Sequence, residues 1–109
     1  MAIHHASAGE IVDLRSLGGA LSQARTTAIV KTKTFEVVRL IVHAGFAINP
    51  HQVSGPMMLH CLEGRVILGL AESQLELSVG QWIYLDGGTQ HSVKGIEHSA
   101  LLLTILFEQ

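Results

Sequence analysis

Two histidines are the residues of this sequence best placed for chemistry. His51 follows an apolar stretch and the turn-forming pair Asn49 and Pro50, and His91 follows a turn-forming run at residues 86–90 that contains two glycines. Both histidines are therefore expected at the start of a strand, where an imidazole can point into the mouth of a β-barrel. A neutral imidazole can ligate a divalent transition metal or hydrogen-bond an organic ligand, and the sequence leaves both possibilities open.

The elements that position these histidines are expected to be strands. From residue 25 onward, β-branched and aromatic residues gather in short runs between glycine, proline and asparagine turns, without a helical period. This pattern predicts an all-β antiparallel barrel or sandwich in one domain, at residues 25–109. Residues 1–24 are expected to form an N-terminal strand and turn segment that contacts a second subunit, with a short strand at 11–14 and a turn or helical turn at 17–21. The runs lie at residues 26–31, 35–43, 57–63, 66–71, 75–79, 82–85, 91–94 and 99–107.

Composition narrows the classes of partner. The 109 residues carry a net charge of −2 and no basic run, which argues against nucleic acid as a partner. The longest apolar run, residues 100–106, is far shorter than the roughly 20 residues of a membrane helix, so no membrane span is expected. Cys61 is the single cysteine and no leader opens the chain, so a cytoplasmic location is the default expectation. Hydrophobic residues make up 48%, and residues 37–42 and 100–106 are apolar on both faces, which predicts a homodimer.

The histidines and several glycines also fit a known pair of sequence motifs. Over residues 37–107 the sequence resembles the cupins, specifically the small single-domain cupins of the cupin-2 or RmlC-like type. The resemblance implies a double-stranded β-helix, the cupin jelly-roll barrel, whose mouth holds the site. Its first motif is matched by Gly45, His51 and Gly64, and its second by Gly80, Gly88 and His91.

The departures from these motifs bear on function. Val53 stands where the family has a second histidine and Met57 where it has a glutamate, so two of the four usual metal ligands are missing. His51 and His91 remain as candidate ligands for zinc, iron, manganese or nickel, and two imidazoles alone predict weak affinity. In the second motif, Asp86 replaces a proline and Gly95 replaces an asparagine.

Other polar residues could modify this site. His60 is three residues after Met57 on a strand, so its side chain should face away from the cavity. His43 and Gln52 remain possible replacement ligands, and Asp86 could orient His91, although an aspartate before two glycines is first a turn residue. Cys61 is expected inside the barrel as a small hydrophobe. No role is expected for the remaining histidines, which are His4, His5 and His98.

The walls of the site are expected to be apolar, because Met57, Leu59, Trp82 and Tyr84 should line or underlie the cavity. The function predicted first is a binding module that holds a small organic ligand between His51, His91 and these walls, with a degenerate or weak metal site. The alternative is a metal-dependent cupin enzyme of the dioxygenase, isomerase or decarboxylase type. A third possibility is an interaction protein whose apolar strands serve assembly.

Overall fold

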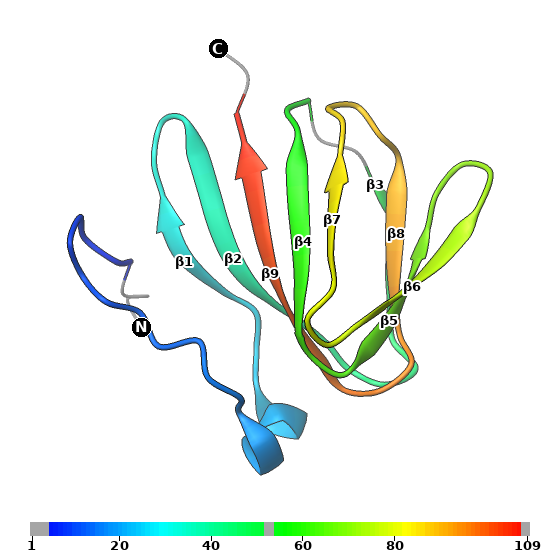
Figure 1. The fold of residues 1–109 in the computed structure, drawn as a ribbon, viewed down its shortest axis with the longest axis horizontal. Coiled ribbons are helices and arrows are strands. Elements are labelled where there is room, and N and C mark those ends of the chain that lie inside the picture. Colours follow the sequence, from blue (N-terminus) through cyan, green and yellow to red (C-terminus); the bar gives the residue numbers. More distant parts are fainter. Residues whose placement is uncertain (1–4, 52–53, 108–109) are drawn as a thin grey trace.

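The fold consists of a short 3-10 helix followed by strands (Figure 1). The structure is a computed structural model that describes residues 5–51 and 54–107, with no account of the side chains at positions 49–51. The described elements are η1 (Gly18–Gln23), β1 (Thr27–Lys31), β2 (Phe35–Val42), β3 (Ala47–His51), β4 (Met57–Glu63), β5 (Arg65–Gly69), β6 (Gln74–Ser78), β7 (Trp82–Leu85), β8 (His91–Gly95) and β9 (Ser99–Leu106). No helix in the described ranges is long and apolar enough to cross a membrane.

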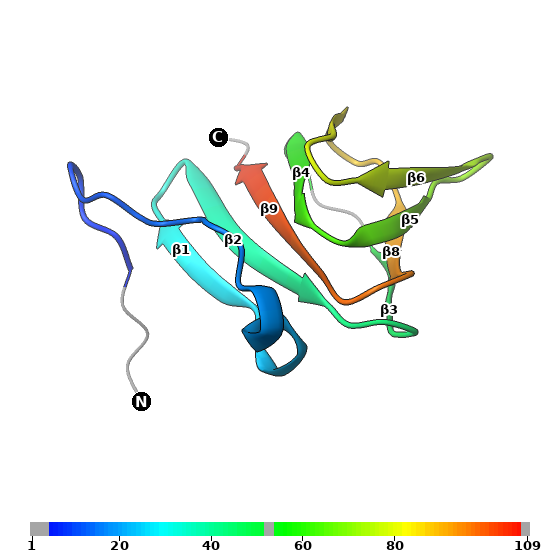
Figure 2. The ribbon, with the colours of Figure 1, turned by 60° about the horizontal axis from the view of Figure 1, so that its bottom comes forward.

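The strands form two facing sheets, as Figures 1 and 2 show. One sheet has five strands in the order β1-β2-β9-β4-β7, and the other has four in the order β3-β8-β5-β6. Neighbouring named strands pair antiparallel in both sheets. The predicted all-β antiparallel jelly-roll barrel is confirmed.

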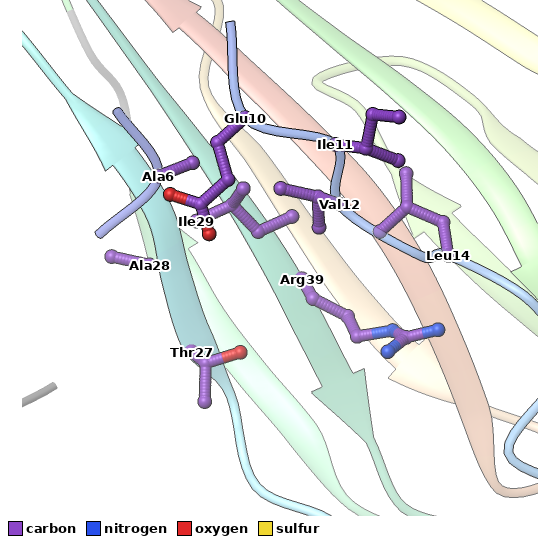
Figure 3. Close-up of a pocket in the computed structure, with 9 residues that line it drawn as sticks. All are labelled: Ala6, Glu10, Ile11, Val12, Leu14, Thr27, Ala28, Ile29 and Arg39. Carbon is purple, nitrogen blue, oxygen red and sulfur yellow. The ribbon is translucent and has the colours of Figure 1, made fainter. Parts of the chain in front are cut away.

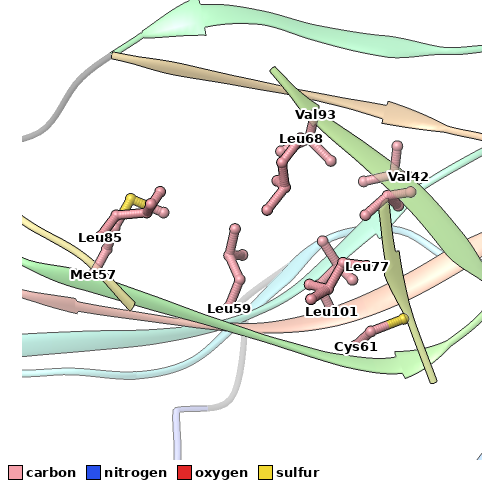
Figure 4. Packing of buried hydrophobic residues seen from close by; sticks show 10 residues of the cluster. Val42, Met57, Leu59, Cys61, Leu68, Leu77, Leu85, Val93 and Leu101 are labelled. Atoms are coloured by element: carbon pink, nitrogen blue, oxygen red, sulfur yellow. The ribbon is translucent and has the colours of Figure 1, made fainter. Parts of the chain in front are cut away.

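The main core lies between the two sheets and is apolar (Figure 4). On β4, Met57, Leu59 and Cys61 are buried while Met58 and His60 are only half-buried, so alternate side chains of this strand enter the core. Removing a fully buried leucine from such a core costs about 3–5 kcal/mol. The cluster contains Val42, Met57, Leu59, Cys61, Val66, Leu68, Leu77, Leu85, Val93 and Leu101.

The N-terminal segment lies over the outer face of the five-stranded sheet. Leu21 of η1 packs with Ile41 of β2 and Ala100 of β9 in a second small cluster. β2 and β9 are apolar on both faces, and the N-terminal segment of the same chain therefore covers part of their outer face. The strand expected at residues 11–14 is not formed, and Ile11 is 92% exposed. The Ala6 N–H donates to the Ile29 carbonyl oxygen of the edge strand β1 at 2.7 Å, but residues 11–14 form no ladder with that strand.

One carboxylate ties the N-terminal segment to the sheet. Glu63 accepts hydrogen bonds from the Leu17 N–H at 2.7 Å, the Gly18 N–H at 3.3 Å and the Ser16 hydroxyl at 2.7 Å. It therefore serves as a distant cap at the start of η1. Partial burial raises the pKa of Glu63, but these hydrogen bonds and the nearby Arg39 charge outweigh it, so the pKa is lowered overall.

From residue 25 onward the strand predictions hold except around His51. The bounds of β4 and β7 agree with the predicted runs at 57–63 and 82–85. The turn-forming pair Asn49 and Pro50 predicts a strand that starts at His51, but Ala47–His51 forms β3, so His51 ends a strand instead of starting one. The reason is that β3 is the edge strand of its sheet, where Pro50 is tolerated because one side of the strand needs no ladder partner.

Candidate functional site

His91 is the best-defined polar group of the predicted site. It begins β8 and is only 2% exposed. Its Nδ1 lies 3.0 Å from the Thr89 carbonyl oxygen, which can only accept, so Nδ1 carries a hydrogen and a neutral ring has its lone pair on Nε2. Thr89 is held in turn by its N–H and its hydroxyl, which donate to the Asp86 carbonyl at 3.2 and 2.7 Å. The turn before β8 therefore fixes both the tautomer and the orientation of the imidazole.

The fold brings the two predicted histidines to adjacent strands. His51 and His91 are partners in the register of β3 and β8, one at the end of its strand and the other at the start. Antiparallel partners are neighbours across the ladder, so the backbone places the pair at one end of the barrel. The His51 side chain lies outside the description, as do Gln52 and Val53.

A hollow of about 340 Å³ opens beside His91. Its wall comes from the β5–β6 hairpin and from the turn before β8, and it includes two amide side chains and a hydroxyl that the sequence analysis did not single out. Only the positions of Gln90 and Ser92, on either side of His91, could have drawn attention to this wall. The lining residues are Gly69, Leu70, Ala71, Gln74, Gln90, His91 and Ser92.

Met57 and Leu59 belong to the hydrophobic core and are 3% and 1% exposed. Met57 pairs with Leu85 of β7, and the two side chains lie together in Figure 4. The position where the family motif has a glutamate is thus occupied by a thioether packed among apolar side chains.

The prediction that Trp82 and Tyr84 line the cavity is wrong, because neither side chain faces the barrel interior. They are 57% and 50% exposed, whereas Ile83 and Leu85 pack in the core. Because side chains alternate along a strand, Trp82 and Tyr84 lie on the outer face of β7.

Asp86 does not orient His91. Its carboxylate accepts a hydrogen bond from the Tyr84 hydroxyl at 2.8 Å, which raises the pKa of Tyr84. The carbonyl of Thr89 holds the imidazole instead. His60 faces away from the core, as predicted. His43 cannot replace a ligand beside His91, because it follows β2 at the opposite end of the barrel (Figure 1).

The described donors do not fit the metal site that the cupin motifs imply. Within residues 5–48 and 54–107, no three histidine, cysteine, aspartate or glutamate side chains gather as a metal site would require. Met57 supplies no charge where a carboxylate would offset that of a divalent cation. Cys61 is fully buried, and burial raises the pKa of its thiol, so the thiolate that binds metals is disfavoured.

A second hollow, of about 400 Å³, lies outside the barrel between the N-terminal segment and β1 (Figure 3). Ile11, Val12 and Ile29 give it apolar walls, and Arg39 crosses its floor. The Arg39 Nη2 donates to the Arg15 carbonyl oxygen at 2.9 Å, so this side chain helps to hold the N-terminal segment. No motif residue lines this hollow, and it is not the predicted site.

Comparison with known proteins defines the class of fold. No family model matches the sequence, and no curated protein does. Solved structures do match, and they show the cupin double-stranded β-helix, which confirms the resemblance to the cupins at the level of the fold.

Three of these structures show the extent of the similarity. A conserved protein of unknown function from Streptococcus pyogenes has a TM-score of 0.78 at 17% identity, covering 100% of this chain and 96% of its own. An RmlC-like cupin family protein from Methanocaldococcus jannaschii has a TM-score of 0.73 at 13% identity, covering 90% and 93%. A cupin superfamily protein from Desulfitobacterium hafniense has a TM-score of 0.74 at 12% identity, covering 76% of each chain.

Proposed function

We propose that this protein binds a small organic molecule at the end of the barrel where His51 and His91 pair. The observation that carries the proposal is His91, an almost fully buried imidazole whose tautomer is fixed by a backbone carbonyl and which lines a hollow of about 340 Å³. That volume lies within the range of small-molecule sites. Gln74, Gln90 and Ser92 add amide and hydroxyl groups to the wall, which favours a polar ligand bearing hydroxyl, amide or carbonyl groups.

Binding and variants together test this proposal. We would screen small polyols, hydroxy acids and amides by ligand-observed NMR, and compare the wild type with His91→Gln and Gln90→Ala. A hit whose affinity falls by about tenfold or more in either variant supports the proposal, since each buried hydrogen bond to a ligand contributes about 1–3 kcal/mol. His60→Ala is the matched control, because His60 faces the outer side of β4. Hits that bind every variant equally would place the ligand elsewhere.

A metal-dependent enzyme is the second candidate, and one observation favours it. A ring N–H donated to a backbone carbonyl, as in His91, is the outer contact that metal-ligating histidines usually make. Elemental analysis of protein purified without a metal-affinity tag decides between the two. About one metal ion per chain, lost in both His51→Ala and His91→Ala, would overturn the binding module in favour of the enzyme. A metal content that neither variant changes supports the binding module.

A further inference from the structure

Two further histidines meet at the other end of the barrel. His43 follows β2 and His98 precedes β9, and because Val42 pairs with Ser99 they occupy the next facing positions of the same ladder. Their Nδ1 atoms lie 3.2 Å apart, with the ring planes at 81°. The connections β2–β3 and β8–β9 that carry them lie at the end opposite the β7–β8 turn (Figure 1).

The neighbours of this pair determine where the ring hydrogens are. His43 Nε2 lies 3.1 Å from the Ala24 carbonyl oxygen, which can only accept, so Nε2 carries a hydrogen and a neutral His43 has its lone pair on Nδ1. His98 Nδ1 lies 3.2 Å from the Ala44 backbone nitrogen, which can only donate, so this Nδ1 also presents a lone pair. Two lone pairs of neutral rings then face each other, which is repulsive unless a cation lies between them.

We propose that His43 and His98 bind a divalent transition metal ion through their two Nδ1 atoms. Zinc–nitrogen bonds of about 2.0–2.1 Å at a tetrahedral angle separate two ligand nitrogens by roughly 3.4 Å. The observed 3.2 Å is within a few tenths of an ångström of that separation. Imidazole ligands select zinc, copper, nickel and related ions of intermediate softness.

The surroundings of the pair suit such a site. The His43 Nε2–H donated to Ala24 is the outer contact typical of a metal-ligating histidine. A bound ion would use the His98 Nδ1 lone pair that now accepts the hydrogen bond from the Ala44 N–H. Because Ala44 is exposed, water can accept a hydrogen bond from this N–H instead. His98 is exposed and His43 half-buried, which gives an ion access from solvent. No third histidine, cysteine or carboxylate within the described ranges completes a ligand group, so water fills the remaining positions.

Two glycines hold the backbone of the pair. A Cβ on Gly64 would collide with the His98 carbonyl oxygen, and a Cβ on Gly95 would collide with that of His43. The β4–β5 turn at Gly64 therefore packs directly against the backbone of His98, and β8 at Gly95 packs against the backbone of His43. The two nitrogens are positioned before an ion arrives, which reduces the ordering cost of binding.

Metal titration of the tag-free full chain tests the site. Zinc or nickel is titrated by calorimetry into the wild type, His98→Ala and the control His60→Ala, and into the same set in a His51→Ala/His91→Ala background. We expect the wild type, His60→Ala and the His51→Ala/His91→Ala background each to bind one equivalent of metal. In His98→Ala the affinity for this metal ion should fall at least about tenfold. Metal lost only with His51 and His91, and unchanged in His98→Ala, overturns this site and bears instead on the metal-dependent alternative of the proposed function.

Imidazole nitrogen NMR of the unmutated chain provides a second readout that does not depend on a variant folding. On addition of zinc, the Nδ1 resonances of His43 and His98 should shift together, saturating at one equivalent. Unchanged Nδ1 resonances, or equal zinc affinity in the wild type and His98→Ala, overturn the proposal.

Discussion

Replacing Met57 with glutamate restores the acidic residue that the cupin motif has at this position, and the structure predicts that the fold will resist it. Met57 is 3% exposed and packs beside Leu85 inside the barrel. The side chains grouped with Met57 in the core are all apolar, and the buried polar side chains of the described ranges are His91 and Ser99, neither of which is a permanent cation. We therefore expect Met57→Glu to be strongly destabilised at neutral pH.

The expected loss has two parts. Loss of the buried methionine side chain lowers the free energy of unfolding by about 2 kcal/mol, because its apolar surface is no longer buried. An uncompensated buried charge adds about 3–5 kcal/mol. The sum, about 5–7 kcal/mol, is comparable with the whole stability of a small domain, about 5–15 kcal/mol. Burial would raise the folded-state pKa of the new carboxyl above its unfolded value near 4.3, so the charge penalty is absent at low pH and grows as pH rises.

Urea denaturation followed by circular dichroism measures this loss, with Met58→Glu as the matched control. Met58 is the adjacent residue and faces the outer side of β4, so its substitution should cost far less. A Met57→Glu protein within about 1 kcal/mol of the wild type at pH 7, or two variants of equal stability, would refute the reasoning.

Four further predictions follow from the fold. Gly64 and Gly80 both have positive φ (80° and 85°), so alanine is strained at either position. Only at Gly64 does backbone of another segment lie where the Cβ would be, so Gly64→Ala should lower the urea midpoint of unfolding far more than Gly80→Ala. The lowered pKa of Glu63 means that its stabilising contribution is present above the unfolded value near 4.3 and is lost as pH falls through the folded one. Acid should thus release the N-terminal segment to proteolysis, and Glu63→Gln should release it at pH 7 as well. Cys61 should react with thiol reagents only in denaturant, since it is buried and its pKa is raised; rapid labelling of the native protein would contradict its placement. Trp82 is an exposed aromatic residue on the outer face of β7, so Trp82→Glu should dissociate the predicted homodimer. Light scattering measures the molar mass of both proteins, and a monomeric wild type would refute the homodimer.

Most of the fold could be predicted because turn residues and β-branched runs are local signals. The direction of side chains on β7 could not, since Trp82, Ile83, Tyr84 and Leu85 are all apolar and alternation alone does not say which pair faces inward. The spacing predicted His91 at the start of a strand, where the structure has it, but part of the wall beside it comes from the β5–β6 hairpin, which is distant in sequence.

The pairing of His43 with His98 illustrates the same limit. These residues are 55 positions apart, and neither belongs to the cupin motifs. They meet because β2 and β9 pair antiparallel, so that β2 ends at the level where β9 begins. Such a pair follows from strand register, which is set by tertiary packing and not by local sequence.

The position of Met57 also weighs on the choice between a binding module and an enzyme. If the missing glutamate had been replaced at a solvated rim, one substitution could restore a metal ligand at little cost. Instead, Met57 is packed against Leu85 in the hydrophobic cluster, so a carboxylate could be accommodated there only by repacking the core or by a metal ion that offsets its charge. The absence of the acidic ligand is therefore built into the stability of this chain, which favours recognition by His91 and its polar wall over metal catalysis.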